Sequence, residues 1–260
     1  MGVIIKSAQE VAVMRRAGRI LADVLEELKA RVRPGMRTRE LDTIAAREIA
    51  RRGAKPSFKG YRGFPASLCV SVNDEIVHGI PGERVLLEGD IVSLDLGVIF
   101  DGFQSDAAVT VGVGKISRES RELIEATRGA LEAGIASARP KARLGDISAA
   151  IEQYAESRGY RVVREYSGHG IGRDMHEEPQ VPNCTRPPFG LMAGAGPELK
   201  PGMTLALEPM VNAGDWRTRV GADMWLVLTA DGSRSAHFEH TIAITDAEPE
   251  VLSVREGVYA

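Results

Sequence analysis

Residues 91–106, I-V-S-L-D-L-G-V-I-F-D-G-F-Q-S-D, constrain the fold of this chain more than any other stretch. An Asp-Gly pair between two apolar, β-branched runs is the strongest short-range signal for a β-hairpin with a two-residue turn. In that hairpin Asp106 faces Gly97. Because side chains alternate along a strand, Asp95 and Gly97 share a face, so Asp95 and Asp106 are diagonal neighbours about 7 Å or less apart at Cβ. The hairpin therefore predicts two adjacent carboxylates on one face.

Two adjacent carboxylates cost free energy unless a group that compensates their charge lies between them. Asp95 stands in an apolar run with Leu94, Leu96 and Val98. Two like charges repel each other, and a buried acid has to be paired or bound to a metal ion. The hairpin alone leaves two interpretations open, a metal site and a pair of solvated aspartates on an exposed strand.

Two histidines lie in the segment S-G-H-G-I-G-R-D-M-H-E-E-P, at His169 and His176. Its glycines resemble a dinucleotide-binding loop, but Arg173 replaces the final glycine and no helix follows, so we reject that function. Glycines beside His169 allow the backbone to approach a site closely. A lone histidine is more often structural, whereas two in one loop strengthen the case for a metal site.

Two glutamates and a third histidine complete the candidates. Glu208 follows the apolar run T-L-A-L, and Glu239 precedes the apolar run I-A-I. His78 stands before a glycine in E-I-V-H-G-I-P-G. A surface acid at a strand end, or a histidine in a turn, remains the alternative for each of them taken singly.

The periodicity of the rest predicts an α/β protein. Helical spacing of apolar residues extends from Ser7 to about 33, and then over 38–53, 118–138 and 146–158. Strand patterns occupy 91–113 and 203–244, where they include T-L-A-L, M-W-L-V-L-T and H-T-I-A-I-T. The polar connector R-P-K-A-R-L-G divides the chain into two related halves, roughly 1–139 and 140–260. With 260 residues, one domain over 1–260 is expected.

Composition excludes several classes of protein. A net charge of −3 gives no general attraction to nucleic acid or to an anionic membrane. Two cysteines cannot build a disulfide framework, and five histidines exclude a histidine-rich metal site but not a carboxylate-rich one. No apolar stretch reaches the roughly 20 residues of a membrane span, and no secretory signal is visible. We therefore expect a cytoplasmic protein.

Five groups of motifs follow one another along the chain: V-H-G-I-P, S-L-D-L-G with D-G-F-Q-S-D, S-G-H-G-I-G with H-E-E-P, L-E-P-M-V, and F-E-H-T. Together they resemble the methionine aminopeptidases of the bacterial type I class, in the M24 metallopeptidase family, over nearly the whole chain. One motif alone would be weak evidence, but the combination is specific. The resemblance implies an α/β (α+β) pita-bread fold, in which two halves related by a pseudo-twofold axis enclose a dinuclear metal site.

The resemblance also implies an activity and a ligand set. The enzyme would be a methionyl aminopeptidase, a hydrolase that removes the initiator methionine from chains with a small second residue by attack of a metal-bridging hydroxide. Two divalent ions, Co²⁺, Mn²⁺ or Fe²⁺ with Zn²⁺ tolerated, suit a site of carboxylates and one imidazole. The implied metal ligands are Asp95, Asp106, His169, Glu208 and Glu239.

Further roles carry over to matching positions. Glu208 would also shuttle a proton, His176 would stabilise the oxyanion, and His78 would hydrogen-bond the scissile amide nitrogen. The resemblance implies an apolar methionine pocket formed by Tyr61, Phe64, Cys69, Met175 and Trp225, with Phe58 nearby. Each of these taken singly could be ordinary core.

Three features depart from close relatives. Phe58 replaces a smaller residue and Met175 often replaces an aromatic one, so the dimensions of the pocket are in question. The stretch Val181–Glu198 is longer, and its Pro and Gly content predicts a surface loop.

Three related classes are disfavoured. Xaa-Pro aminopeptidases and dipeptidases carry an extra N-terminal domain, for which Asp95 lies too early in this chain. The stretch from His169 to Glu208 is too short for the helical insertion of the type II enzymes. Binding modules of this fold lose metal ligands, whereas all five are present here. The expected partners are nascent polypeptide N-termini and the ribosome, and the expected state is a monomer.

Overall fold

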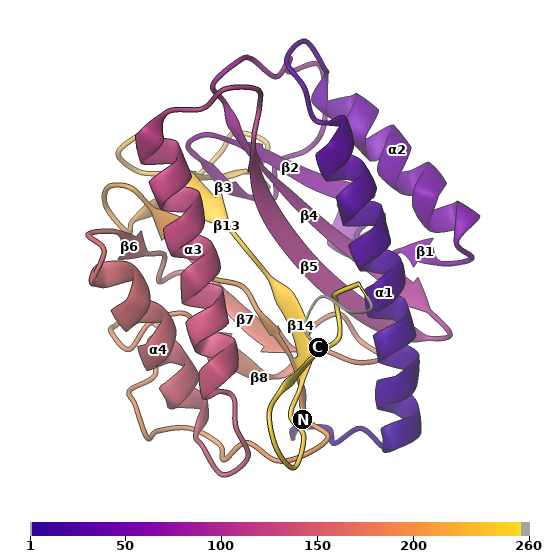
Figure 1. Cartoon of the computed structure of the whole chain (residues 1–260), viewed down its shortest axis with the longest axis vertical. Coiled ribbons are helices and arrows are strands. Elements are labelled where there is room, and N and C mark those ends of the chain that lie inside the picture. The colour runs from indigo at the N-terminus through magenta and orange to yellow at the C-terminus, as the bar shows by residue number, and fades with distance from the viewer. Residues whose placement is uncertain (1, 256–260) are drawn as a thin grey trace.

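The computed structural model describes residues 2–255. Its helices lie over one face of the strands, with α1 and α2 on one side and α3 and α4 on the other (Figure 1). They are α1 (Ala8–Arg31), α2 (Thr38–Arg51), α3 (Arg118–Ser137) and α4 (Leu144–Glu156), and a short 3₁₀ turn, η1, spans Tyr61–Gly63. Among these described residues no helix is long and apolar enough to cross a membrane.

The strands form antiparallel sheets. One sheet has the order β1-β4-β2, with β5 paired to β4, and consists of β1 (Lys55–Pro56), β2 (Leu68–Val72), β4 (Ile91–Phe100) and β5 (Phe103–Gly112). A second has the order β15-β14-β9-β7-β8, from β7 (Ser167–Gly170), β8 (Glu177–Pro182), β9 (Thr204–Leu207), β14 (His240–Ala243) and β15 (Glu250–Val251). Two smaller sheets contain β3 (Glu75–Val77), β6 (Arg161–Val162), β10 (Met210–Asn212), β11 (Thr218–Val220), β12 (Val227–Thr229) and β13 (Ser235–His237).

The predicted hairpin is confirmed. Strands β4 and β5 pair in the expected register, with Gly97 opposite Asp106. Both turn residues have positive φ, 48° at Asp101 and 78° at Gly102, as a type I′ turn requires. The register places the Asp95 side chain on the same face as that of Asp106.

The two larger sheets meet at the strands that carry predicted site residues. The backbone N–H of Glu239 donates to the carbonyl of Ala108 at 2.9 Å, and the N–H of Ala108 donates back to the carbonyl of Glu239 at 3.3 Å. Next to this pair, the Thr241 hydroxyl donates to the carbonyl of Asp106 at 2.8 Å. Segments far apart in the sequence are therefore joined at the acids themselves.

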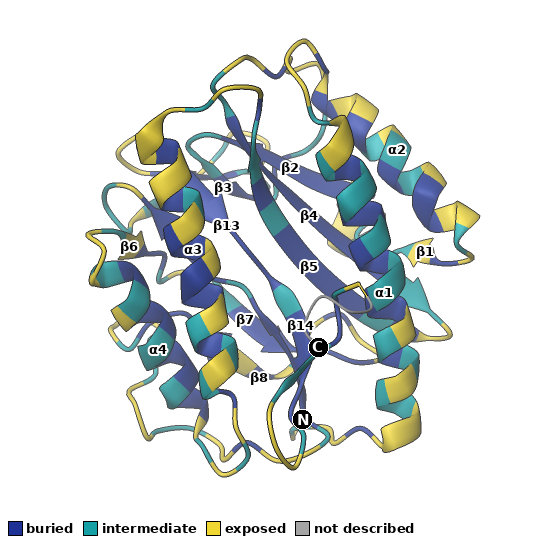
Figure 2. Ribbon diagram, viewed as in Figure 1, coloured by how far each residue is buried: buried dark blue, intermediate teal, exposed yellow. Residues whose placement is uncertain are grey.

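Two buried cores lie between the helices and the sheets (Figure 2). One core is built from residues of 17–113 under α1 and α2. The other is built from Ile91 and residues of 123–244, under α3 and α4. The predicted division of the chain into halves near residue 139 stays a prediction. Helix α3 precedes that point but packs in the second core, so the two cores do not divide the chain there.

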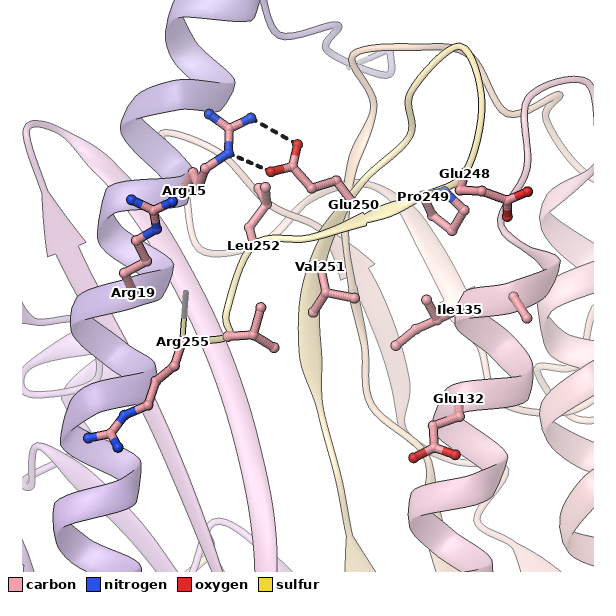
Figure 3. Close-up of a pocket in the computed structure, with 12 residues that line it drawn as sticks. Arg15, Arg19, Glu132, Ile135, Glu248, Pro249, Glu250, Val251, Leu252 and Arg255 are labelled. Atoms are coloured by element: carbon pink, nitrogen blue, oxygen red, sulfur yellow. Dashed lines mark hydrogen bonds and ion pairs between the residues drawn. The ribbon is translucent and has the colours of Figure 1, made fainter. Parts of the chain in front are cut away.

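The last described strand is tied to the first helix. The Arg15 guanidinium on α1 binds both carboxylate oxygens of Glu250 on β15, at 2.5 and 2.8 Å (Figure 3). A cavity of about 490 Å³ lies here between α1 and α3, on the helix-covered face. None of the predicted site residues lines it.

Three details differ from the sequence prediction. Helix α4 begins at Leu144, because the Asp146 carboxylate accepts the N–H of Arg143 and so caps the helix from its first turn. Strand β12 is shorter than M-W-L-V-L-T, because the Asp223 carboxylate accepts the N–H groups of Trp225 and Leu226 in a turn. The predicted Val181–Glu198 loop begins two residues late, because Val181 and Pro182 pair with β7.

Candidate active site

The structure brings every residue predicted for the site into one cavity of about 150 Å³. It is lined by Phe58, Tyr61, Arg62, Phe64, Cys69, His78, Asp95, Asp106, His169, Met175, His176, Glu208, Trp225 and Glu239. The volume is far below the roughly 300–1,000 Å³ of cavities that take drug-sized ligands. A cavity of this size accepts one side chain, with the acids at one end.

The acids form a buried cluster. Ligand atoms of Asp106, His169 and Glu239 all lie within 4.8 Å of one another. One carboxylate oxygen each of Asp95, Asp106 and Glu239 is buried with no hydrogen-bond partner among the described residues. Buried acceptors are normally satisfied, so these oxygens fit a site that binds a cation.

His169 presents one nitrogen to this cluster. Its Nδ1 lies 2.8 Å from the carbonyl of Gly170, to which it donates, so Nε2 is left as an acceptor. Nε2 lies 3.6 Å from Oε1 of Glu208, beyond hydrogen-bond distance. The flanking glycines approach neighbouring backbone: a Cβ at Gly168 or Gly170 would lie 2.3 Å from a carbonyl oxygen. They therefore pack β7 tightly and hold the imidazole in place.

Burial shifts the pKa of each charged group toward its neutral form. It raises the pKa of Asp95 to about 7. The pKa values of Asp106 and Glu239 are raised well above the usual range by burial and then by the neighbouring carboxylates, and the pKa of Glu208 is raised by burial and Asp95. Burial lowers the pKa of His169 to about 4. A cluster of acids that repel one another, with one neutral imidazole, fits hard divalent cations such as Mn²⁺, Fe²⁺ and Co²⁺.

Two further histidines border the cluster. The His176 ring lies 4.2 Å from that of His169 between centroids, and the Tyr61 hydroxyl lies 2.8 Å from its Nδ1. His78 has φ 61°, a left-handed conformation, and its ring meets Trp225 edge-on at 6.4 Å. Burial lowers the pKa of both histidines, that of His176 to about 3.

On the apolar side of the cavity, the lining side chains of Phe58 and Met175 pack closely against Gly97. A Cβ at Gly97 would lie 2.7 Å from Cε1 of Phe58 and 3.0 Å from Cε of Met175. Phe64 packs edge-on against Trp225 at 5.2 Å. Phe58 and Met175 therefore fill the space over this glycine.

Sequence reasoning missed one lining residue, Arg62. Its φ is 49°, and its guanidinium lies over the Tyr61 ring at 5.3 Å. Its charge contributes to the lowered pKa of His176, after burial and His169. Its position between two glycines, directly after Tyr61, was the available signal.

The surface loop after β8 stays outside the cavity. Phe189 and Met192, both exposed, lie in it. Asn183, at its start, donates from Nδ2 to the carbonyl of Glu208 at 3.1 Å. The loop therefore contacts the site at the backbone of Glu208, through Asn183.

Comparison with known proteins gives a consistent result. The sequence profile of metallopeptidase family M24 matches residues 12–246. Methionine aminopeptidase 1 of Bacillus subtilis is 51% identical over 251 residues, 96% of this chain and 99% of the relative. Methionine aminopeptidase of Clostridium perfringens is 52% identical over 252 residues, 97% of this chain and 99% of the relative.

Solved structures agree. Methionine aminopeptidase from Thermotoga maritima superposes with a TM-score of 0.94 at 44% identity, over 98% of this chain and 100% of that one. Prolidase from Pyrococcus furiosus shares the fold alone, with a TM-score of 0.78 at 22% identity over 97% of this chain and 66% of that one. The expected α/β pita-bread fold is thus confirmed. The chain belongs to metallopeptidase family M24 and, within it, to the methionine aminopeptidases.

Proposed function

We propose that this chain removes the N-terminal methionine from peptides and nascent polypeptides whose second residue is small. One observation carries the proposal: a buried carboxylate cluster adjoins an apolar cavity of about 150 Å³ that has room for one side chain. The membership of the chain among the methionine aminopeptidases supports the same activity.

Two divalent ions would be held by the cluster described above, Asp95, Asp106, His169, Glu208 and Glu239. The buried carboxylate oxygens of Asp95, Asp106 and Glu239 that lack partners support this assignment. Bound ions of this kind supply Lewis acidity toward the scissile carbonyl and make water acidic enough to serve as a nucleophile at neutral pH. Mn²⁺, Fe²⁺ and Co²⁺ suit the donor set best, and Zn²⁺ is tolerated.

The side chains of the site then handle protons and orientation. The Glu208 carboxylate would accept a proton from the attacking water and deliver it to the departing amide nitrogen. Nε2 of His176, whose Nδ1 faces the Tyr61 hydroxyl, would donate to the carbonyl oxygen as negative charge develops on it. His78, on the opposite side against Trp225, would hydrogen-bond the scissile nitrogen.

The apolar wall selects methionine. Phe58, Phe64, Cys69, Met175 and Trp225 surround the space beside the cluster. Sulfur and aromatic surfaces suit a thioether by shape and polarizability. Because the cavity ends at these side chains, it limits the length of the side chain that the first residue of the substrate can carry.

The cellular setting follows from the substrate. Nascent N-termini arise at the ribosome, so we propose that the chain works in the cytoplasm, close to ribosomes, as a monomer with a single catalytic domain over 1–260. Its net charge of −3 gives no basic surface of its own for RNA, so no nucleic-acid specificity is proposed.

The proposal is tested by release of free methionine. Purified protein loaded with Co²⁺ or Mn²⁺ should cleave Met-Gly-Met-Met at its first bond and leave the N-acetylated peptide intact. The Asp95→Ala variant should be inactive, while Asp246→Ala, at an exposed position, should match the wild type. An inactive loaded wild type, or a fully active Asp95→Ala, would refute the function. Cleavage of Ala-Pro instead would assign a prolidase activity.

A further inference from the structure

We propose that the N-terminal segment of this chain, residues 2–4, forms one wall of a channel that holds the substrate beyond its second residue. The inference rests on the proposed function and adds a second binding region to it. It makes Ile4 a residue that determines how well long peptides bind, although Ile4 takes no part in the chemistry.

The channel is a second cavity of about 390 Å³, next to the methionine pocket. Both cavities are lined by Arg62, His169 and His176, so they meet at the proposed position of the scissile bond. The methionine side chain enters the smaller cavity, so the rest of the peptide has to extend away from the carboxylate cluster in another direction. The larger cavity gives it a path along the protein surface.

One side of this channel is the β7–β8 hairpin. Ser167 on β7 and Gln180 on β8 line it, and Gln180 pairs directly opposite His169. Side chains of opposite residues lie on the same face of a sheet. Gln180 therefore stands beside the imidazole, with an amide that can bind the backbone of an extended peptide.

The other side is the chain's own N-terminal segment, through Gly2 and Ile4. Ile4 is 47% exposed and lines this cavity, so its side chain is available to contact a bound peptide. Ile5 is equally exposed at 50% but does not line the channel, and its Cγ2 would lie 2.7 Å from a Cβ at Gly202. The two neighbouring isoleucines thus provide a matched pair.

Lys6 fixes this wall to the site. Its ammonium group forms a buried ion pair with Glu177, with 3% and 4% of the two side chains exposed, and its N–H donates to the carbonyl of Gly202 at 2.8 Å. Glu177 directly follows His176, and its other oxygen accepts the N–H of Arg173 at 2.9 Å. One ion pair therefore connects the N-terminal segment to the turn that carries His176.

The test separates short from long substrates. Methionine p-nitroanilide has no residue beyond the scissile bond, whereas Met-Gly-Met-Met extends into the channel. We expect Ile4→Asp to raise KM for the tetrapeptide about three- to tenfold with kcat within about twofold of the wild type, and to leave both constants for the anilide unchanged. Ile5→Asp, the matched control, should behave as the wild type on both substrates.

The outcomes distinguish this inference from the function on which it rests. A wild type that cleaves neither substrate overturns both. A wild type that cleaves both, with Ile4→Asp affecting the tetrapeptide no more than Ile5→Asp does, overturns the channel alone. An equal loss on the anilide and the tetrapeptide also overturns it, since that pattern belongs to general damage. If Ile4→Asp fails to fold, Ile4→Ser is measured against Ile5→Ser. We again expect a higher KM for the tetrapeptide in the Ile4 variant alone, and equal KM values in the two variants would overturn the channel.

Discussion

The phenol oxygen of Tyr61 lies 2.8 Å from Nδ1 of His176, and the two rings stack with centroids 5.5 Å apart and an interplanar angle of 17°. A hydroxyl that donates to Nδ1 leaves the imidazole proton on Nε2. In that tautomer Nε2 can donate toward the substrate, as the role proposed for His176 requires, and Tyr61 also forms part of the pocket wall.

Removal of this hydroxyl should slow catalysis. In Tyr61→Phe the ring remains but Nδ1 of His176 loses its donor, and we expect kcat on Met-Gly-Met-Met to fall by about tenfold with KM nearly unchanged. His176→Ala should cost about 10²–10³-fold in kcat, the usual effect of losing one oxyanion donor. Steady-state kinetics on both variants checks this. Tyr160→Phe, outside the cavity, is the control. An equal loss of kcat in Tyr61→Phe and His176→Ala would show that His176 contributes to catalysis only while the Tyr61 hydroxyl orients it.

Metal removal should expose the repulsion inside the cluster. Without a cation, burial and neighbouring carboxylates raise the cost of ionising these acids: Asp95 and Glu208 do so for Asp106, and Asp106 does so for Glu239. We expect chelation to lower the Tm of the wild type, and metal-free Asp106→Asn to melt above metal-free wild type by the equivalent of about 1–3 kcal/mol. Thermal unfolding with and without EDTA measures both.

Metal addition provides the second half of this test. It should raise the Tm of the wild type and leave that of Asp106→Asn nearly unchanged. Asp246→Asn should respond to metal as the wild type does. A metal-free Asp106→Asn protein that melts below the metal-free wild type would show that the acids are not in conflict.

The narrow wall over Gly97 should set selectivity for side-chain length. Phe58 and Met175 both reach the space above this glycine, so Phe58→Ala opens the end of the cavity. One extra methylene in a close-fitting pocket costs about 10-fold or more in kcat/KM. We expect Phe58→Ala to reduce the preference for methionine over ethionine at the first residue by about tenfold. Competition between the methionine and ethionine peptides measures the ratio of their kcat/KM values directly. Phe189→Ala, on the exposed loop, should leave this ratio unchanged. An unchanged ratio in Phe58→Ala would show that this wall does not select for side-chain length.

Acid stability should depend on one carboxylate on α2. Arg52 and Arg51 donate to Glu48 at 2.7 and 2.8 Å and lower its pKa from 4.5 to about 2. Because the folded pKa lies below the unfolded one, the stabilisation is complete above about pH 4.5 and is lost as the pH falls toward 2. The difference in free energy of unfolding between wild type and Glu48→Gln should therefore shrink over that range.

Urea unfolding at neutral pH and at about pH 3 measures this difference. Glu198→Gln, at an exposed position in the loop after β8, provides the control for a general effect of removing a carboxylate. A difference that grows on acidification would reverse the assigned sign.

Local signals in the sequence predicted local structure well. The Asp-Gly turn determined the register of β4 and β5, because both turn residues need positive φ and few pairs adopt it readily. The helix predicted from Ser7 likewise begins at Ala8, where Ser7 and Glu10 form a capping box. The predicted ends of helices and strands were wrong where an aspartate side chain accepts backbone N–H groups of its own turn, as Asp146 and Asp223 do.

Local signals in the sequence do not predict how the site is assembled. Asp95 and Asp106 come together within one hairpin, but His169 and Glu239 reach them through pairing between sheets that are distant in the sequence. Nothing local specifies that pairing, and only the resemblance placed these side chains together. Arg62 was missed because a positive-φ arginine in a turn carries no periodicity.

The backbone pair between Ala108 and Glu239 has a consequence for the lifetime of the protein. A cation held by Asp106 and Glu239 together would close a loop of about half of the chain, as a cross-link does, and such a loop opens only when its tie is released. The bound cation would then slow unfolding as well as enable hydrolysis. A cell short of that cation would hold fewer copies of this protein, because metal-free chains open more often and opened chains are degraded.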